Sequence, residues 1–232
     1  MPAWIFKRIS KLKAVVFVAC LIPITLLVWA AATHQLSANP LEDIRDTTGI
    51  WTLRFLIATL CITPIRRLTG WHELIRLRRM LGLFSFFYGV LHYVSYVWLD
   101  EFFSIPSMAE DLMKRPFIMA GYASFVMLVP LAITSTKKWI VRLGGRRWQL
   151  LHRLIYLSTA AGIAHYFWRV KLDVQAPIIY GLVLTLLLAA RGRLKRHPQF
   201  LRGSVRHGEL RVRRGMRPTR TQTTTRISDA DS

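Results

Sequence analysis

The sequence predicts an all-α protein, a polytopic membrane bundle of six transmembrane helices with both termini in the cytoplasm. Of its 232 residues, 53% are hydrophobic, and they come in long blocks. The charged residues gather between these blocks, with 33 Lys and Arg against 12 Asp and Glu, a formal net charge of +21. Six of the blocks approach the roughly 20 apolar residues that a helix needs to cross the hydrocarbon core of a bilayer.

The expected spans, in chain order, are Ala14–Thr33, Ile50–Ile65, Met80–Leu99, Phe117–Thr136, Trp148–Trp168 and Val174–Ala190. The first span follows basic residues and ends in AAATH, which resembles the cleavage site of a signal peptide. Its apolar run is long for a signal peptide and five spans follow it, so we expect an uncleaved first helix. The sequence therefore predicts a basic cytoplasmic N-terminus (1–13), a transmembrane domain (14–190) and a basic tail (191–232).

The charges between the spans predict the orientation. The N-terminus, the tail and the connections after the second and fourth spans are rich in Lys and Arg, whereas the connections after the first and third carry Asp and Glu. The positive-inside rule places the basic side in the cytoplasm. The tail ends in TRTQTTTRISDADS, so we expect it to be disordered or bound to anionic membrane lipids. Basic residues that flank apolar spans favour lipid as the partner and argue against nucleic acid.

The two cysteines, Cys20 and Cys61, lie inside apolar runs and form no CxxC motif. We expect packed thiols and no zinc, iron–sulfur or covalently attached haem site.

Three of the seven histidines, His92, His152 and His165, lie inside expected spans. Ionisable side chains are costly in a membrane and usually mark function. At the helical rise, His92 lies roughly 18 Å and His165 roughly 25 Å from the cytoplasmic edge, against roughly 6 Å for His152. His92 and His165 thus share the outer half of the membrane. A pair of neutral imidazoles that face each other across a helical bundle is a usual way to hold the iron of a b-type haem.

Small residues precede two of these histidines at helical spacing, as Gly82, Ser85, Gly89 and His92 in the third span and as Ser158, Gly162 and His165 in the fifth. Such a stripe allows close packing of helices, or it leaves room for a flat macrocycle, which is the interpretation we favour. His152 and His165 are about 140° apart on an ideal helix. Either the helix is distorted near Gly162, or the two residues serve sites on different sides.

Three arginines lie close to the expected haem levels. Arg54, near the outer surface, either snorkels to water or pairs with a haem propionate. Arg153 could do the same on the inner side, although a plain basic edge explains it better. Arg79 stands at the level where a fourth histidine would be needed to pair with His152.

Three segments carry a resemblance to a known family: TPIRRLTG (63–70), RRMLGLFSFFYGVLHY (78–93) and WQLLHRLIYLSTAAGIAHYFW (148–168). Over about residues 10–192 the sequence resembles the MsrQ (YedZ) family, the haem-binding membrane subunit of the bacterial periplasmic methionine-sulfoxide reductase system. The wider group is the ferric-reductase-like transmembrane domain superfamily. The resemblance implies that His92, His152 and His165 bind haem b. It also implies FMN, for which no residue marks a site.

The function that this resemblance implies is electron transfer across the bacterial inner membrane. Electrons would come from the quinone pool or a cytoplasmic flavin reductase. They would leave to a periplasmic molybdopterin-containing methionine-sulfoxide reductase that repairs oxidised proteins. The sequence has no GxGxxG motif and no catalytic constellation on the outer side, so the chain itself is expected to be a non-catalytic electron-transfer subunit.

Two other functions stay open. One is a self-contained ferric or quinol-type haem reductase, which differs only in the electron acceptor. The other is a transporter with a histidine relay, which would require acidic residues within the spans, and these contain none.

The outer segment DEFFSIPSMAEDLMKRP (100–116) is expected either to dock the reductase or to be a connection with an interfacial amphipathic stretch.

Overall fold

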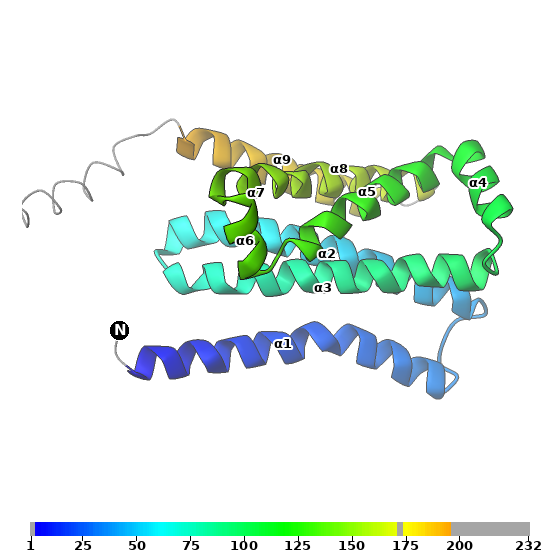
Figure 1. Cartoon of the computed structure of the whole chain (residues 1–232). Helices are drawn as coiled ribbons and strands as arrows, with labels where there is room; N and C mark the ends of the chain where they lie inside the picture. The colour runs from blue at the N-terminus through cyan, green and yellow to red at the C-terminus, as the bar shows by residue number, and fades with distance from the viewer. Residues whose placement is uncertain (1–2, 171–173, 196–232) are drawn as a thin grey trace, which may run out of the picture. The chain divides into compact units, whose positions relative to one another are not determined.

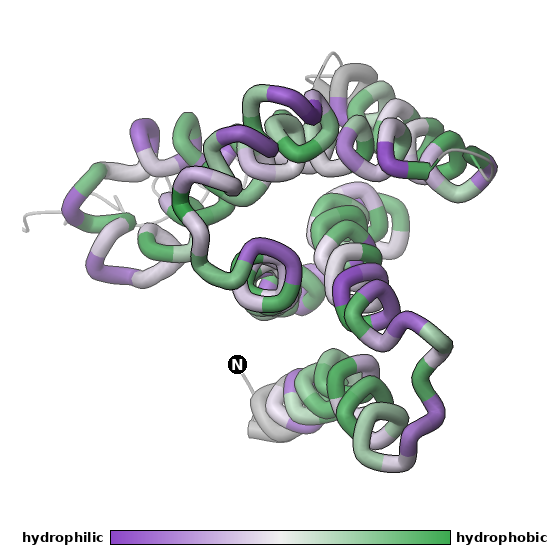
Figure 2. The backbone as a smooth tube through the Cα atoms, turned by 90° about the vertical axis from the view of Figure 1, so that its right-hand side faces the viewer, coloured by the Kyte–Doolittle hydropathy of each residue, from purple (hydrophilic) through white to green (hydrophobic). Residues whose placement is uncertain are grey.

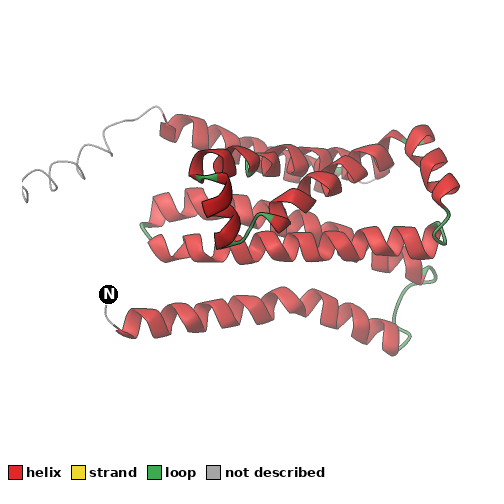
Figure 3. Cartoon of the chain, in the orientation of Figure 1, coloured by secondary structure: helices red, strands yellow, loops and turns green. Residues whose placement is uncertain are grey.

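The computed structural model of the protein describes residues 3–170 and 174–195, which are helical with short connections and contain no strand (Figure 3). The longer helices are α1 (Ala3–Ala32), α2 (Pro40–Thr69), α3 (Ile75–Ser95), α5 (Pro116–Ile133), α8 (Leu154–Arg169) and α9 (Gln175–Lys195). The shorter elements are η1 (His72–Leu74), the π-helical turn η2 (Tyr96–Asp100), α4 (Ile105–Lys114), α6 (Lys137–Leu143) and α7 (Gly145–Leu151). The expected tail lies outside the described residues, apart from the end of α9.

Within the described residues, four helical segments are long and apolar enough to cross a membrane: Ser10–Ala32, Pro40–Thr69, His72–Asp100 and Pro116–Ile133. They coincide with the first four expected spans, and the tube of α1 is hydrophobic along most of its length (Figure 2). The start of α1 and the α2–α3 connection lie at one end of the bundle, and α4 lies at the other (Figure 1). The expectation of six spans with cytoplasmic termini remains a prediction, because the apolar part of α9, Gln175–Arg191, is shorter.

The fifth expected span, Trp148–Trp168, is not one helix, and this corrects the sequence-based expectation. The chain turns at His152 and Arg153, between α7 and α8, where the Arg153 N–H donates to the Leu150 carbonyl (3.1 Å). That three-residue spacing is tighter than an α-helical turn, so the helix axis is interrupted. α8 then runs unbroken through Gly162, so the first of the two alternatives, a distortion of the helix near Gly162, is not observed. With 16 residues α8 is about 24 Å long, less than the hydrocarbon thickness.

Two helix pairs, α2 with α3 and α5 with α8, make the most extensive contacts. Ser85 of α3 donates to the Thr52 carbonyl of α2 (3.3 Å). Between α5 and α8 the bonds are reciprocal: the Ser124 hydroxyl donates to the Ser158 carbonyl (2.8 Å), and the Ser158 hydroxyl to the Ser124 carbonyl (3.0 Å). These members of the small-residue stripes therefore serve close helix packing.

The first helix is attached to the bundle through Tyr88 of α3. Pro23 leaves α1 without one backbone N–H group. At the next position, the Tyr88 hydroxyl accepts a hydrogen bond from the Ile24 N–H (3.1 Å) and donates one to the Cys20 carbonyl (2.9 Å). Tyr88 is fully buried, and Cys20, which has a free thiol, is almost fully buried. One hydroxyl thus satisfies two backbone groups of another helix.

Candidate functional site

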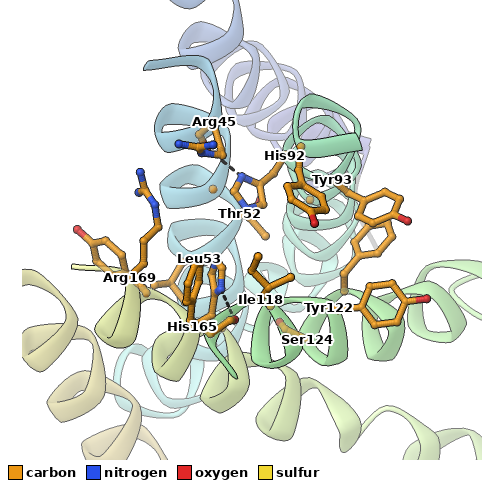
Figure 4. A pocket seen from close by; sticks show the side chains of 18 of the residues that line it. Arg45, Thr52, Leu53, His92, Tyr93, Ile118, Tyr122, Ser124, His165 and Arg169 are labelled. Carbon is orange, nitrogen blue, oxygen red and sulfur yellow. Dashed lines mark hydrogen bonds between the residues drawn. The ribbon is translucent and has the colours of Figure 1, made fainter. Parts of the chain in front are cut away.

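A cavity of about 850 Å³ lies between α2, α3, α5 and α8, with η2 and part of α4 at one end. His92 of α3 and His165 of α8 line it, and Figure 4 shows both rings in the space between the helices. The predicted pair is therefore brought together from two different helices. The cavity has the size of a typical site for a cofactor or another small molecule.

The two imidazoles are held in defined orientations. Their ring centroids are 6.1 Å apart, and their planes are inclined by 72°. The Nδ1 atom of His92 lies 2.9 Å from the carbonyl oxygen of Arg45 in α2, and that of His165 lies 2.6 Å from the carbonyl oxygen of Phe117 in α5. A carbonyl only accepts hydrogen bonds, so each Nδ1 carries the hydrogen and each Nε2 keeps a lone pair.

This arrangement would allow both histidines to bind one metal atom. A metal–nitrogen bond of about 2 Å on each side, with roughly 1 Å more from each nitrogen to its ring centre, would separate the centroids by about 6 Å. A ligand histidine commonly donates its other N–H to a backbone carbonyl, as both rings do here. No group of three His, Cys, Asp or Glu side chains within the described ranges could hold a metal ion by itself. The pair therefore suits a metal that brings its remaining ligands with it, as haem iron does.

Two glycines that the sequence analysis did not single out make room for the rings. A Cβ atom at Gly49 of α2 would lie 2.9 Å from Cε1 of His92, and one at Gly121 of α5 would lie 2.7 Å from Nδ1 of His165. Each glycine therefore lets an imidazole lie against the backbone of the neighbouring helix. A glycine inside a helix lowers the stability of the helix by about 1 kcal/mol relative to alanine. A glycine within a helical stretch of the sequence was therefore the available signal that each position has a special role.

Other members of the small-residue stripes open the cavity. Gly89 and Gly162 line it, together with Ser124. A Cβ at Gly162 would approach the Ser124 hydroxyl to 3.3 Å, so the wall is already tight at this point. The two interpretations of the stripes thus apply to different residues. Ser85 and Ser158 serve close helix packing, whereas Gly89 and Gly162 leave space for the cavity.

One end of the cavity carries paired charges. Arg45 forms an ion pair with Asp100 of η2, and Arg169 of α8 lies 2.5 Å from an Asp46 carboxylate oxygen and 3.3 Å from one of Glu42. Both arginines line the cavity. The Nε atom of Arg45 is buried and makes no hydrogen bond to any described group, so this donor has no partner among them. Such a donor suits an anionic substituent of a bound cofactor.

The arginines chosen from the sequence lie elsewhere. Arg54 is not among the residues that line the cavity. Its guanidinium lies 4.7 Å from the centre of the Trp51 ring, and its Nε donates to the Tyr180 hydroxyl (3.2 Å). Arg79 lines a groove between α1 and α3. Arg153 is exposed.

His152 lies apart from the cavity, at the end of α7. Its ring stacks on Trp148 with a centroid distance of 3.9 Å, and its Nδ1 lies 3.2 Å from the Trp148 carbonyl oxygen. Its Nε2 is buried. Of the two alternatives from helix geometry, the structure favours separate locations for His152 and His165.

Comparison with known proteins gives matches over most of the chain. Residues 48–163 match the family model described as ferric reductase like transmembrane component. A protein of Herminiimonas arsenicoxydans named protein-methionine-sulfoxide reductase heme-binding subunit MsrQ is 51% identical over 186 residues, which cover 79% of this chain and 85% of the relative. The chain belongs to the MsrQ family. The MsrQ proteins of Azospira oryzae (80% of each chain covered) and Rhodospirillum rubrum (77% of this chain and 86% of the relative) are each 47% identical to it. The resemblance inferred from sequence segments is confirmed.

Proposed function

We propose that this chain binds haem b between His92 and His165 and carries electrons across the bacterial inner membrane to a methionine-sulfoxide reductase. The observation that carries the proposal is the pair of imidazoles 6.1 Å apart, each with its Nδ1 on a backbone carbonyl, in one cavity. The relatives are named as haem-binding subunits of such a reductase, which supports the same assignment.

Each part of the site has a physical task in this proposal. The Arg45 and Phe117 carbonyls fix the tautomer and direction of the rings, so that Nε2 of each ring is the ligand atom. The guanidinium groups of Arg45 and Arg169 would pair with the propionates. Bound haem supplies one-electron transfer, and the apolar walls, including Leu53, Leu56 and Leu128, keep water from it.

The proposed topology of six spans with both termini in the cytoplasm sets the side of the membrane on which each redox partner would lie. Electrons would come from the quinone pool or a cytoplasmic flavin reductase, and the acceptor would be the periplasmic molybdopterin-containing subunit that repairs oxidised methionine. His152 would serve a second, inner haem or stabilise that end of the bundle. FMN, which the family resemblance implies, remains a prediction without an assigned site.

The test is the visible spectrum of the purified full-length chain. We expect a Soret band, with sharp α and β bands after reduction by dithionite. His92→Ala and His165→Ala should lose the same spectral species, whereas His34→Ala, in the turn after α1, should keep it.

Three outcomes would overturn parts of the proposal. A colourless preparation from haem-sufficient cells would favour the histidine-relay transporter. Retention of the full spectrum in His165→Ala would remove this pair as the ligands. Rapid reduction of a ferric chelate without a periplasmic partner would favour a self-contained reductase.

A further inference from the structure

A second cavity, a groove of about 490 Å³, lies between α1 and α3 and shares no residue with the histidine cavity. Nine residues line it: Lys13, Phe17, Leu21, Arg76, Arg79, Met80, Leu83, Phe84 and Phe87. Three of the nine are cations, six are apolar and none is acidic. The chemistry of the groove is therefore that of an amphiphile with a negative charge.

The charges and the apolar residues are separated along the groove. α1 and α3 run in the same direction (Figure 1), and Phe17 of α1 contacts Phe84 of α3. Lys13, one turn before Phe17, therefore lies near the level of Met80, next to Arg79. The apolar residues follow in the direction of both helices, as far as Leu21 and Phe87. From Arg76 to Phe87 the groove is about 16 Å long at the helical rise, enough for much of an acyl chain.

Aromatic rings line the apolar part. Phe17 of α1 meets Phe84 of α3 edge to face, with centroids 5.2 Å apart, and Phe84 meets Phe87 in the same way at 6.3 Å. Phe84 is buried, whereas Phe17 and Phe87 are 48% and 40% exposed and leave an apolar surface open to a ligand. The groove thus has a fixed wall and an accessible side.

We propose that this groove binds an anionic phospholipid, with its phosphate at Lys13, Arg76 and Arg79 and an acyl chain along Phe17, Phe84 and Phe87. Basic pockets between transmembrane helices are suited to acidic lipid head groups on the cytoplasmic side, which is the side that the positive-inside rule gives these residues. The lipid would fill the space between α1 and α3 beside the Tyr88 contact. It would thereby stabilise the attachment of the first helix.

The experiment is native mass spectrometry of the full-length chain, delipidated in detergent and then offered lipids of identical acyl chains. We expect phosphatidylglycerol to be retained about tenfold better than phosphatidylcholine, because two or three cations face its net charge. Lys13→Gln with Arg79→Gln should abolish this preference. Arg67→Gln with Lys138→Gln removes the same charge from exposed positions outside the groove and should preserve it.

A second variant tests the apolar part without a change in charge. Leu83→Trp should fill the groove and reduce retention of both lipids, with an unchanged visible spectrum to show that the bundle is intact. Equal retention of the two lipids by the wild type, or an unchanged preference in the Lys13/Arg79 variant, would overturn the proposal.

Competition identifies the source of the phosphate. Inorganic phosphate at millimolar concentration should not displace phosphatidylglycerol, since it lacks the acyl chain. Displacement by free phosphate would reduce the site to an anion site, and displacement by FMN would assign it to the flavin instead.

Discussion

Gly121 of α5 lies so close to His165 of α8 that a Cβ atom on Gly121 would come within 2.7 Å of Nδ1. That nitrogen is also the one bonded to the Phe117 carbonyl, one helical turn earlier on α5. The absence of a side chain at residue 121 therefore lets a single helix both contact the ring and orient it. Gly49 and Arg45 of α2 have the same relationship to His92, again one turn apart.

Substitution of this glycine should weaken cofactor binding without removing a ligand. In Gly121→Ala the methyl group would displace the His165 ring and break its bond to Phe117, and changes of this kind typically cost 10–100-fold in metal affinity. The measurement is the ratio of haem to protein after purification, from the absorbance of the reduced pyridine complex. Gly181→Ala on α9 is the control, because a Cβ there would meet nothing within 4 Å. A full complement of haem in Gly121→Ala would show that this contact does not position the ring.

Removal of a cavity arginine should lower the haem midpoint potential. Arg169→Gln removes a positive charge beside the proposed propionates, which makes the reduced form less favourable. A tenfold change in the equilibrium corresponds to about 59 mV for one electron, so a fall of tens of millivolts is expected. The measurement is a redox titration, with Arg54→Gln as the comparison because Arg54 does not line the cavity. A larger shift in Arg54→Gln than in Arg169→Gln would restore Arg54 as the propionate partner.

Loss of the Tyr88 hydroxyl should destabilise the attachment of α1. Tyr88→Phe leaves the Ile24 N–H and the Cys20 carbonyl without the hydroxyl that bridges them, and an unsatisfied buried polar group costs about 1–3 kcal/mol. The measurement is thermal unfolding in detergent. Tyr122→Phe makes the same chemical change at a side chain that is 45% exposed, and it should have little effect. Equal stability of the two variants would contradict the bridging role.

His152 should behave differently from the pair formed by His92 and His165. His152→Ala should affect another spectral species, or reduce total haem, and leave the species that depends on His92 and His165 in place. The physical reason is location, since His152 stacks on Trp148 outside their cavity. The check is a difference spectrum of the reduced variants at low temperature. If His152→Ala and His92→Ala gave identical spectra and His165→Ala left the spectrum unchanged, the pairing of His92 with His165 by depth in the membrane would be wrong.

The docking hypothesis for residues 100–116 can be tested at a position that leaves the local structure intact. Asp100 and Asp111 are paired with Arg45 and Arg115, so their reversal would disturb the bundle. The Glu110 side chain is 60% exposed and pairs only across a turn of α4, with Lys114. Glu110→Lys should slow haem reoxidation by the partner several-fold at low salt, and less at high salt. Glu73→Lys, in η1 directly before α3, is the control. Equal rates of haem reoxidation in the Glu110→Lys and Glu73→Lys variants would remove α4 from the docking surface.

The sequence predicted the helical fold and the proximity of His92 and His165 because both depend on local signals. Apolar runs define the first four spans, and the depth of a residue in its span follows from counting along the helix. His92 and His165 could therefore be matched by level alone. Their partners could not, because the carbonyls of Arg45 and Phe117 belong to other helices and carry no side-chain signature.

One error and one omission have physical causes that no pattern of hydropathy reveals. The span from Trp148 to Trp168 is continuously apolar around His152 and Arg153, yet a tight turn interrupts it there. In addition, α2 begins at Pro40, well before the apolar block that defined the second span. The first part of this helix therefore supplies Arg45 and Asp46 to the cavity. Helix ends depend on capping and tertiary contacts, as at the Asn39 cap of α2.

Each imidazole forms a hydrogen bond with the backbone of another helix, and this has a consequence for the biogenesis of the protein. His92 is oriented by α2, which is synthesised before it, and His165 by α5, also earlier in the chain. A nascent chain that has inserted only as far as α5 would hold one oriented imidazole and no opposing one. In the binding mode proposed above, all four helices would be needed to hold haem, so pigmented protein could arise only after α8, the last of them, has been synthesised.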